Sequence, residues 1–219
     1  MLVAQSVYYY PFTSAFQNNC NSVLLDGPEK ILIDPGHKFN WPKLSQMIAK
    51  DGIDPSSIKL VLYTHCHPDH MEAGEILETD YGAVQAMSPE EKVFYDGPGL
   101  SFFSWMGLDI PKGHIGRTVA EGRLELSDKV LDIYLTPGHS PGSICLHWPE
   151  VGVLVTGDLV FARGWGRTDF EGGDSKAIVE SITRMSKLAD VSTLLCGHGP
   201  AVMGETRVAD NFRHVLAML

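Results

Sequence analysis

Residues 64–70 read Thr64-His65-Cys66-His67-Pro68-Asp69-His70, so three imidazoles, a thiol and a carboxylate stand close together. The apolar run Ile-Lys-Leu-Val-Leu-Tyr at residues 58–63 comes directly before them. Groups of this kind are costly to bury unless they are paired or bound to a metal ion. The stretch is therefore either a solvated loop that happens to be rich in histidine, or half of a metal site.

The composition is that of a folded globular protein with an acidic charge balance. The chain has 219 residues, of which 44% are hydrophobic and 20% charged, and its formal net charge is -10. We expect a single domain over residues 1–219, and the charge argues against nucleic-acid and anionic-membrane partners. The sequence shows neither a membrane-spanning run nor a signal peptide. Four scattered cysteines indicate reduced thiols, and hence a cytoplasmic protein.

Strand and helix patterns occur in both halves of the chain. Apolar β-type runs bounded by turn residues predict strands at residues 6–10, 21–27, 29–36, 58–64, 83–88 and 192–199, with a β-rich region over 123–158. Helical periodicity predicts helices at residues 40–50, 71–79 and 174–190, and over about the last fifteen residues. Residues 89–121 look less regular. The pattern predicts an α/β fold of four layers, with helices outside two paired sheets.

Three further candidate ligands follow β-type runs, and each comes directly after a glycine. They are His139 in Thr-Pro-Gly-His, Asp158 in Thr-Gly-Asp and His198 in Cys-Gly-His. Glycine lets the backbone turn sharply and direct the next side chain toward a common point. Asp34, after Ile-Leu-Ile, lies in the same kind of position. Taken with residues 64–70, these positions favour a metal site over chance enrichment.

With these motifs in this order, the sequence resembles the metallo-β-lactamase superfamily from about Asn19 to His198. The resemblance implies an αββα sandwich that holds two divalent metal ions at one edge, most readily zinc, with iron or manganese as alternatives. It implies that Asp34 supports the motif loop without binding metal, and that Cys66 is a spacer. The implied ligands are His65, His67 and His139 for the first ion, Asp69, His70 and His198 for the second, and Asp158 between both.

The remaining histidines fit no motif, and we interpret them as structural or surface residues. His37 is the one most expected to approach the site, because it follows the Ile-Asp-Pro-Gly turn; the others are His114, His147 and His214.

Two metal ions that share a water lower its pKa from 15.7 toward about 7 and so supply a nucleophile at neutral pH. This favours a hydrolase in which Asp69 also accepts a proton. The stretch Gly157–Asp174 resembles type II glyoxalases, which hydrolyse thioesters of glutathione, and persulfide dioxygenases. Only 21 residues follow His198, so we expect the C-terminal helical domain that carries much of the glutathione site in full-length type II glyoxalases to be missing.

We expect a glyoxalase-like thioester hydrolase that acts on a small molecule such as a thiol conjugate. The main alternative is a dioxygenase with one iron on His65, His139 and Asp158, but Pro68 and Met71 depart from its usual pattern. A lactonase and a non-catalytic metal-binding protein also stay open.

Substrate contacts are less determined by the sequence. Arg163 and Arg167 either bind a substrate carboxylate or are solvated and ion-paired. Residues 97–113 contain the aromatic cluster Phe-Phe-Ser-Trp-Met and form a possible lid or insert. In that cluster Phe103 and Trp105 are candidates to line an acyl pocket, with a homodimer contact and ordinary core packing as the alternatives.

Overall fold

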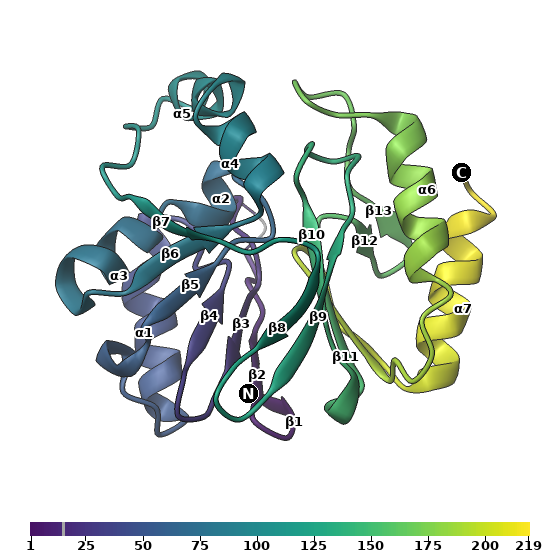
Figure 1. Ribbon diagram of the computed structural model, residues 1–219, viewed down its shortest axis with the longest axis horizontal. Coiled ribbons are helices and arrows are strands. Elements are labelled where there is room, and N and C mark those ends of the chain that lie inside the picture. Colours follow the sequence, from purple (N-terminus) through teal and green to yellow (C-terminus); the bar gives the residue numbers. More distant parts are fainter. Residues whose placement is uncertain (15) are drawn as a thin grey trace.

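The computed structural model describes residues 1–14 and 16–219, and it places two β-sheets face to face between two layers of helices (Figure 1). This arrangement confirms the predicted four-layer αββα fold. The first sheet has the strand order β1-β2-β3-β4-β5-β6-β7. Its strands are β1 Leu2–Ala4, β2 Val7–Tyr10, β3 Ser22–Leu25, β4 Ile31–Ile33, β5 Leu60–Leu62, β6 Val84–Met87 and β7 Ile115–Thr118.

The second sheet comes from the later part of the chain and has the order β15-β14-β11-β10-β9-β8. Its strands are β8 Gly122–Glu125, β9 Val130–Leu135, β10 Ile144–Trp148, β11 Val153–Gly157, β14 Thr193–Cys196 and β15 Val202–Met203. A separate two-stranded hairpin, β12 Val160–Phe161 and β13 Gly164–Trp165, follows β11.

Helices from each half cover the sheet of that half (Figure 1). Those on the first sheet are α1 Trp41–Lys50, α2 Pro68–Met71, α3 Gly74–Tyr81, α4 Pro89–Tyr95 and α5 Ser101–Trp105. Those on the second are α6 Ser175–Met185 and α7 Glu205–Leu216. Short 3-10 helices occur at Lys38–Asn40, Pro55–Ser57, Pro98–Leu100 and Pro149–Val151. None of the helices within residues 1–14 and 16–219 has the length and apolar character needed to cross a bilayer.

Three apolar layers hold these four layers of secondary structure together. On β5, Val61 packs toward the helices of the first half, whereas Leu60 and Leu62 pack between the two sheets. Both faces of β5 are thus covered, which explains why its sequence is a continuous apolar run. A third cluster, which includes Leu154 and Phe212, fills the space between the second sheet and α6 and α7.

The ends of strands from the two sheets meet at one edge of the sandwich. The amide of Ile144, at the start of β10, donates a hydrogen bond of 2.9 Å to the carbonyl of Thr64, just after β5. The amide of Asn21, just before β3, donates a bond of 2.7 Å to the carbonyl of Gly197, just after β14. Because β4, β5 and β6 run parallel, the loops that leave β4 and β5 also lie at this edge.

The structure differs from the predicted secondary structure in two places. Residues 89–121 are not irregular, because they contain α4, α5 and β7. The Ser88 hydroxyl accepts a hydrogen bond from the Glu91 amide and caps α4, a start signal that the sequence analysis passed over. The helix predicted over 71–79 corresponds to α3, which begins only at Gly74, and the short helix α2 ends at Met71 before it.

Candidate metal centre

Four of the predicted ligands come from the short segment between β5 and the end of α2. His65 and His67 lie in the loop, and Pro68 begins α2 at a position where its missing amide hydrogen is not needed. Asp69 and His70 then follow in the first turn of that helix. All four ligand side chains are buried, with His65 and His70 fully so. The tight loop and single helical turn bring them to one small volume.

The other three ligands arrive from three separate loops, after β9, β11 and β14. Together the seven residues form three overlapping groups whose ligand atoms lie within 4.8 Å of one another. The groups are His65, His67 and His139; His65, His70 and Asp158; and Asp69, His70 and His198. The structure therefore brings all seven predicted ligands together.

Two glycines make this convergence possible. Gly157, which precedes Asp158, has φ +49°, and a Cβ at this position would lie 2.4 Å from the Thr64 hydroxyl oxygen. Gly197, which precedes His198, lies so close to Asp158 that a Cβ would be 2.2 Å from Oδ1. Real Cβ atoms do not tolerate such contacts, so packing requires glycine at both positions, and the positive φ of Gly157 favours glycine there as well.

Hydrogen bonds on the outer side of the rings fix which nitrogen of three histidines carries the proton. His139 Nδ1 lies 2.7 Å from the Arg167 carbonyl oxygen, and His70 Nδ1 lies 2.9 Å from Asp34 Oδ2. His65 Nδ1 lies 3.1 Å from the hydroxyl of Thr64, which itself donates to Asp34. These oxygens accept, so each Nδ1 is a donor and each Nε2 points into the centre, where a metal ion could bind it.

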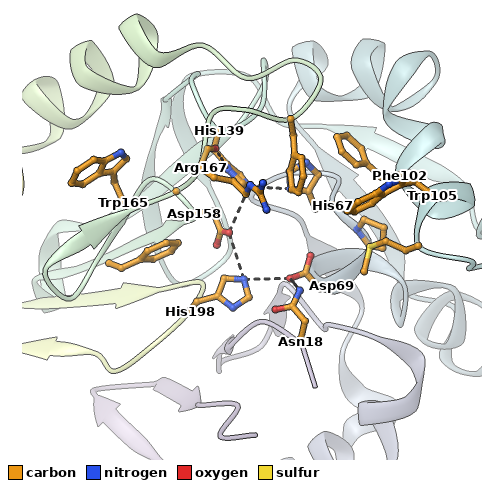
Figure 2. A pocket seen from close by; sticks show the side chains of 15 residues that line it. Asn18, His67, Asp69, Phe102, Trp105, His139, Asp158, Trp165, Arg167 and His198 are labelled. Atoms are coloured by element: carbon orange, nitrogen blue, oxygen red, sulfur yellow. Dashed lines mark hydrogen bonds and ion pairs between the residues drawn. The ribbon is translucent and has the colours of Figure 1, made fainter. Parts of the chain in front are cut away.

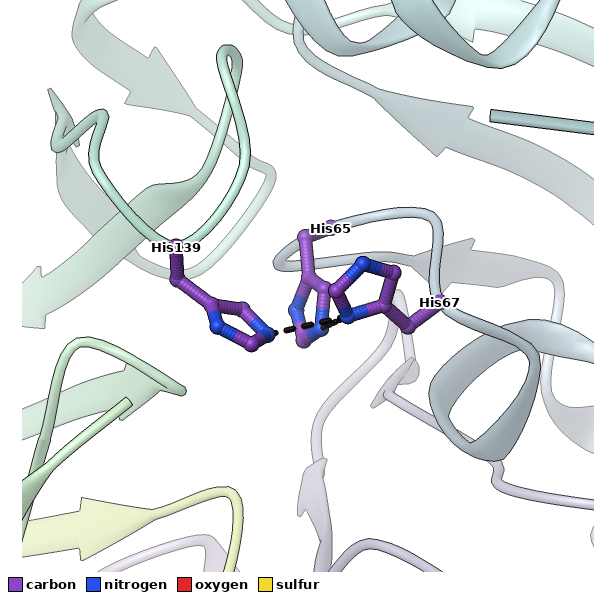
Figure 3. Close-up of side chains that lie close together, drawn as sticks. All are labelled: His65, His67 and His139. Atoms are coloured by element: carbon purple, nitrogen blue, oxygen red, sulfur yellow. Dashed lines mark hydrogen bonds between the residues drawn. The ribbon is translucent and has the colours of Figure 1, made fainter. Parts of the chain in front are cut away.

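The ring nitrogens that face the centre lie close to one another, and one proton between them cannot supply a hydrogen bond to every one. His67 Nδ1 lies 3.1 Å from His65 Nε2 and 2.9 Å from His139 Nε2 (Figure 3). Burial and the neighbouring imidazoles lower the pKa of His65 well below its usual range and that of His67 to about 3. Neutral rings whose lone pairs face a common point fit a bound cation, so this donor set suits a divalent metal.

Asp158 lies between His139, a ligand expected for the first ion, and His198, a ligand expected for the second (Figure 2). Its Oδ2 is 3.5 Å from His139 Nε2 and 3.5 Å from His198 Nε2, and its Oδ1 is 3.3 Å from His70 Nε2. Oδ1 is buried without a hydrogen-bond partner among the described residues. Burial disfavours its charge, but His198 and His70 outweigh burial and hold the pKa of Asp158 well below its usual range. An ionised, buried and partly unsatisfied carboxylate in this position suits a bridge between two cations.

Asp69 and His198 complete the third group, which corresponds to the site expected for the second ion. Asp69 Oδ2 lies 3.3 Å from His198 Nε2 and accepts a hydrogen bond of 2.7 Å from the Asn18 side chain. Burial opposes ionisation here as well, but the hydrogen bond with His198 and the charge of His70 lower the pKa of Asp69. For His70, burial lowers the pKa, yet Asp158 and Asp34 outweigh it and raise the pKa well above the usual value. The carboxylates around His70 and His198 therefore stabilise a positive charge at this part of the centre.

Asp34 has the supporting position expected of it. Its carboxylate accepts hydrogen bonds from the Thr64 amide at 2.8 Å, the Thr64 hydroxyl at 2.6 Å and His70 Nδ1 at 2.9 Å. It is buried, has φ +51°, and belongs to none of the convergent ligand groups. One carboxylate thus orients the loop after β5 and one of its histidines.

Glu91 is a residue of the site that the sequence analysis missed. It is fully buried on α4, and its carboxylate accepts hydrogen bonds from the Cys66 amide at 2.7 Å, the Ser140 hydroxyl at 2.8 Å and the Gly142 amide at 2.8 Å. It therefore ties the loop of His65 and His67 to the loop of His139. The sequence signal was Ser-Pro-Glu-Glu at residues 88–91, which has the spacing of a capping box. In the structure, the glutamate side chain serves the ligand loops.

Asn21 has a comparable role and was also missed. Its side-chain amide donates hydrogen bonds of 3.0 Å to the Cys196 carbonyl and 2.8 Å to the Gly199 carbonyl. It thereby fastens the loop of His198 to the first sheet. No motif marks a single asparagine for such a task.

A pocket opens above the ligands, and it contains two of the four predicted substrate residues, Trp105 and Arg167 (Figure 2). Phe103 is a correction: it is fully buried in the core beside Tyr95. The residue before it, Phe102, lines the pocket, because adjacent residues of α5 point in different directions. The pocket has a volume of about 570 Å³ and is otherwise lined by Asn18, His67, Pro68, Asp69, Met106, His139, Asp158, Phe161, Trp165, Gly166, Phe170 and His198.

Arg163 is a second correction. It lies in the turn between β12 and β13 with φ +65°, and its amide donates a hydrogen bond of 2.7 Å to Asn211 of α7. Its side chain lines a separate groove along α7 and not the metal pocket. The hairpin points Phe161 and Trp165 to the pocket and turns the residues between them away.

The histidines that fit no motif stay outside the ligand groups. His37 is buried and its Nδ1 lies 2.8 Å from Glu72 Oε2, so it supports the neighbouring turn and does not reach the pocket. His147 is buried on β10, His114 is exposed, and His214 lies on α7.

Comparison with known proteins agrees with this geometry. The family profile of the metallo-beta-lactamase superfamily matches residues 15–198. A probable metallo-hydrolase from Methanocaldococcus jannaschii is 34% identical, covering 82% of this chain and 87% of its own. The hydroxyacylglutathione hydrolase GloC of Haemophilus influenzae is 31% identical, covering 85% and 87%. A structure solved in a di-iron-bound form is 31% identical, with a TM-score of 0.73 and coverage of 89% and 94%.

The αββα sandwich with a histidine and aspartate cluster at its edge defines a class of metal-dependent hydrolases. The chain belongs to the metallo-β-lactamase superfamily, within which it is a metallohydrolase.

Proposed function

We propose that this protein is a dinuclear metallohydrolase that cleaves thioesters of small molecules, as a compact member of the type II glyoxalase-like branch. The observation that carries the proposal is the position of Asp158. Its two oxygens face histidines of both ligand groups at 3.3 to 3.5 Å, which suits one carboxylate shared by two ions. A di-iron-bound relative of similar fold also supports two ions. We propose zinc as the usual metal, with iron or manganese able to fit the same donors.

Two ions held by these residues would supply a hydroxide nucleophile at neutral pH and polarise the scissile carbonyl. The chain itself holds the donor atoms in place through Asp34, Glu91 and the carbonyl of Arg167. Asp69 borders the pocket and is ionised, because its pKa is lowered. Its carboxylate would therefore accept a hydrogen bond from the attacking water and orient it. Apolar side chains that line the pocket, such as Phe102, Phe161 and Phe170, would limit the access of water to the reacting groups.

Thioesters are proposed because of two sequence relationships. One relative is a hydroxyacylglutathione hydrolase at 31% identity, and the stretch Gly157–Asp174 resembles that of type II glyoxalases. A small thiol conjugate is therefore the proposed substrate class. A cytoplasmic location and a homodimer stay predictions.

The test combines elemental analysis of freshly purified protein with a panel of thioesters and lactones. The variant is Asp158→Asn, which keeps the shape of the side chain but removes the bridging charge. Its matched control is Asp80→Asn, at an exposed residue of α3 that belongs to none of the ligand groups and does not line the pocket. We expect close to two metal ions per chain, thioester turnover in the native protein and the control, and loss of both metal and turnover in Asp158→Asn.

Other results contradict the proposal in distinct ways. One iron per chain, with oxygen consumption on a persulfide, would establish the dioxygenase alternative. Tight metal with no turnover of any ester or thioester would indicate a non-catalytic metal-binding protein. Turnover of lactones alone would place the activity in another hydrolase class.

A further inference from the structure

One wall of the metal pocket is formed by the helix α5. Phe102, Trp105 and Met106 are three and four residues apart, so they share one helix face, which lines the pocket. Phe102 is buried and its ring lies 4.5 Å from that of His67, whereas Trp105 is 72% exposed. The wall thus runs from the metal ligands outward to the solvent. Trp105 and Met106 are both exposed and continue from the pocket, and contiguous exposed apolar surface of this kind is typical of a binding site.

Phe170 connects this wall to the loop after β13. Its ring lies 5.5 Å from Phe102, 5.7 Å from Trp105 and 5.8 Å from His67, each in an edge-to-face arrangement. The Arg167 guanidinium stacks on the Phe170 ring at 3.8 Å. These contacts define an aromatic wall that consists of Phe102, Trp105, Met106 and Phe170. It begins at a metal ligand, so a group that packs on it lies beside the reacting atoms.

Aromatic side chains also stand on the opposite side of the ligands. Trp165 and Phe161 come from the β12–β13 hairpin, and the Phe161 ring lies 6.0 Å from that of His198. Figure 2 shows Trp165 on one side of the ligands, with Phe102 and Trp105 on the other. The pocket above the ligands therefore has apolar side chains on two sides.

The pocket offers little to bind a highly charged substrate beyond the metal ligands themselves. Over residues 1–14 and 16–219, Arg167 is the one lysine or arginine that lines it. Its guanidinium already makes two hydrogen bonds to Asp169, at 2.7 and 2.6 Å. A glutathionyl group carries two carboxylates and an ammonium, and the lining supplies no matched set of partners for these charges. Burying such charges without partners is unfavourable.

We propose that the aromatic wall binds an apolar acyl group, and that this protein selects thioesters by the size of that acyl group and not by a glutathione moiety. This inference rests on the proposed thioester hydrolysis. Its substrate class is a thioester with an aliphatic or aromatic acyl group on a small thiol that is uncharged or carries a single negative charge. Each methylene that the wall removes from water improves kcat/KM by up to roughly fourfold.

The experiment uses the metal-containing protein and two series of thioesters. In one series, acetyl, butyryl, hexanoyl and benzoyl groups are attached to N-acetylcysteamine, a small uncharged thiol; in the other, the same acyl groups are attached to glutathione. We expect kcat/KM to rise at least about tenfold from acetyl to hexanoyl, and glutathione to give no advantage over N-acetylcysteamine. Trp105→Ala should flatten this rise. The matched control Val93→Ala, at an exposed residue of α4, should retain it.

A binding measurement separates this inference from the proposed function. The probe is S-hexyl-N-acetylcysteamine, a thioether that cannot be hydrolysed, and calorimetry gives its dissociation constant for the native protein and both variants. Binding that is weakened in Trp105→Ala, without turnover of any thioester, would reject the hydrolase but support the apolar site. Turnover that is independent of acyl size, unaffected by Trp105→Ala, or dependent on glutathione would support the hydrolase and overturn the aromatic wall.

Discussion

The ligand cluster and the aromatic wall lie within one pocket but are built in opposite ways. Most ligands are buried, and their outer atoms have fixed partners, such as Asp34 for His70 and the Arg167 carbonyl for His139. The wall ends in Trp105, which is 72% exposed and held mainly by an edge contact with Phe170. We therefore expect the rigid cluster to determine the class of reaction and the more exposed wall to determine which substrates are accepted. Substitutions in the two regions should differ accordingly in kind and in size.

The largest effect is expected from removing a ligand of the cluster. His139→Ala should lower kcat/KM by more than the roughly 100-fold that the loss of an outer partner of a metal ligand causes. We also expect the metal content to fall by about one ion per chain, because His139 belongs to one of the ligand groups alone. Elemental analysis and steady-state kinetics measure both quantities. His114→Ala, at an exposed histidine, is the matched control, and an active His139→Ala protein with full metal content would show that the cluster is not the catalytic centre.

A second prediction concerns the scaffold of the cluster. Glu91→Ala would leave three buried donors, on Cys66, Ser140 and Gly142, without their acceptor. An unsatisfied buried donor costs about 1 to 3 kcal/mol, so the free energy of unfolding should fall by roughly 3 kcal/mol or more. Glu91→Gln keeps one acceptor oxygen and should lose less. Urea unfolding measures the stability of both variants. The control is Glu90→Ala, at the exposed neighbouring residue. Equal stability of Glu91→Ala and Glu90→Ala would mean that the two ligand loops hold their positions independently.

The cluster could be predicted from the sequence because its chemistry restricts residue type and spacing. A histidine or aspartate that follows a strand and a glycine, repeated at several strand ends, has few explanations other than metal binding. Glu91 could not be predicted as a partner of the ligand loops, since its capping-box spacing indicates only a helix start. Its contacts with Cys66 and Gly142 join segments that are 25 and 51 residues away in the chain. Sequence spacing carries no information on such distant contacts.

The wall was predicted only in part, for a different reason. Phe102 and Phe103 are adjacent and chemically equal, and which of them faces the pocket depends on the rotation of a five-residue helix. So short a helix has too few turns for a periodicity to fix that rotation. Arg163 and Arg167 are similarly alike in sequence, and the hairpin between β12 and β13 decides that they line different grooves. Charge and aromaticity indicate a binding residue, but not the surface on which it lies.

A smaller effect is expected at the rim of the pocket. Asp169→Asn would release the Arg167 guanidinium from an exposed ion pair while leaving it stacked on Phe170. Exposed pairs contribute little, so kcat/KM for a thioester with one carboxylate should rise by at most about fivefold. An uncharged thioester should show no change, and Asp80→Asn should affect neither substrate. A gain above about tenfold on the carboxylate substrate would mean that Arg167 contributes more to selectivity than the aromatic wall. A similar gain on the uncharged substrate would show that the effect does not come from pairing between Arg167 and the carboxylate.

The smallest effect is expected at a buried histidine outside the cluster. His147 on β10 pairs in register with Asp132 and Leu154, and neither of its ring nitrogens has a hydrogen-bond partner within the described part of the chain. Burial lowers its pKa, although Asp132 and Asp190 oppose the shift. Protonation therefore favours the unfolded chain, where histidine titrates near 6.5. The stability that neutral His147 contributes is present above this pH and is lost as the pH falls below it.

His147→Leu should remove this loss without affecting metal content. Urea unfolding at pH 7.5 and pH 5.5 should show a smaller decrease for the variant than for the native protein, by at most about 1.4 kcal/mol per pH unit for one proton. The histidines of the cluster are common to both proteins, so the difference between the two decreases isolates His147. Identical decreases would show that His147 keeps its ordinary pKa in the folded protein. A smaller decrease with unchanged metal content would show that burial lowers the pKa of His147 and that this histidine has no part in the metal centre.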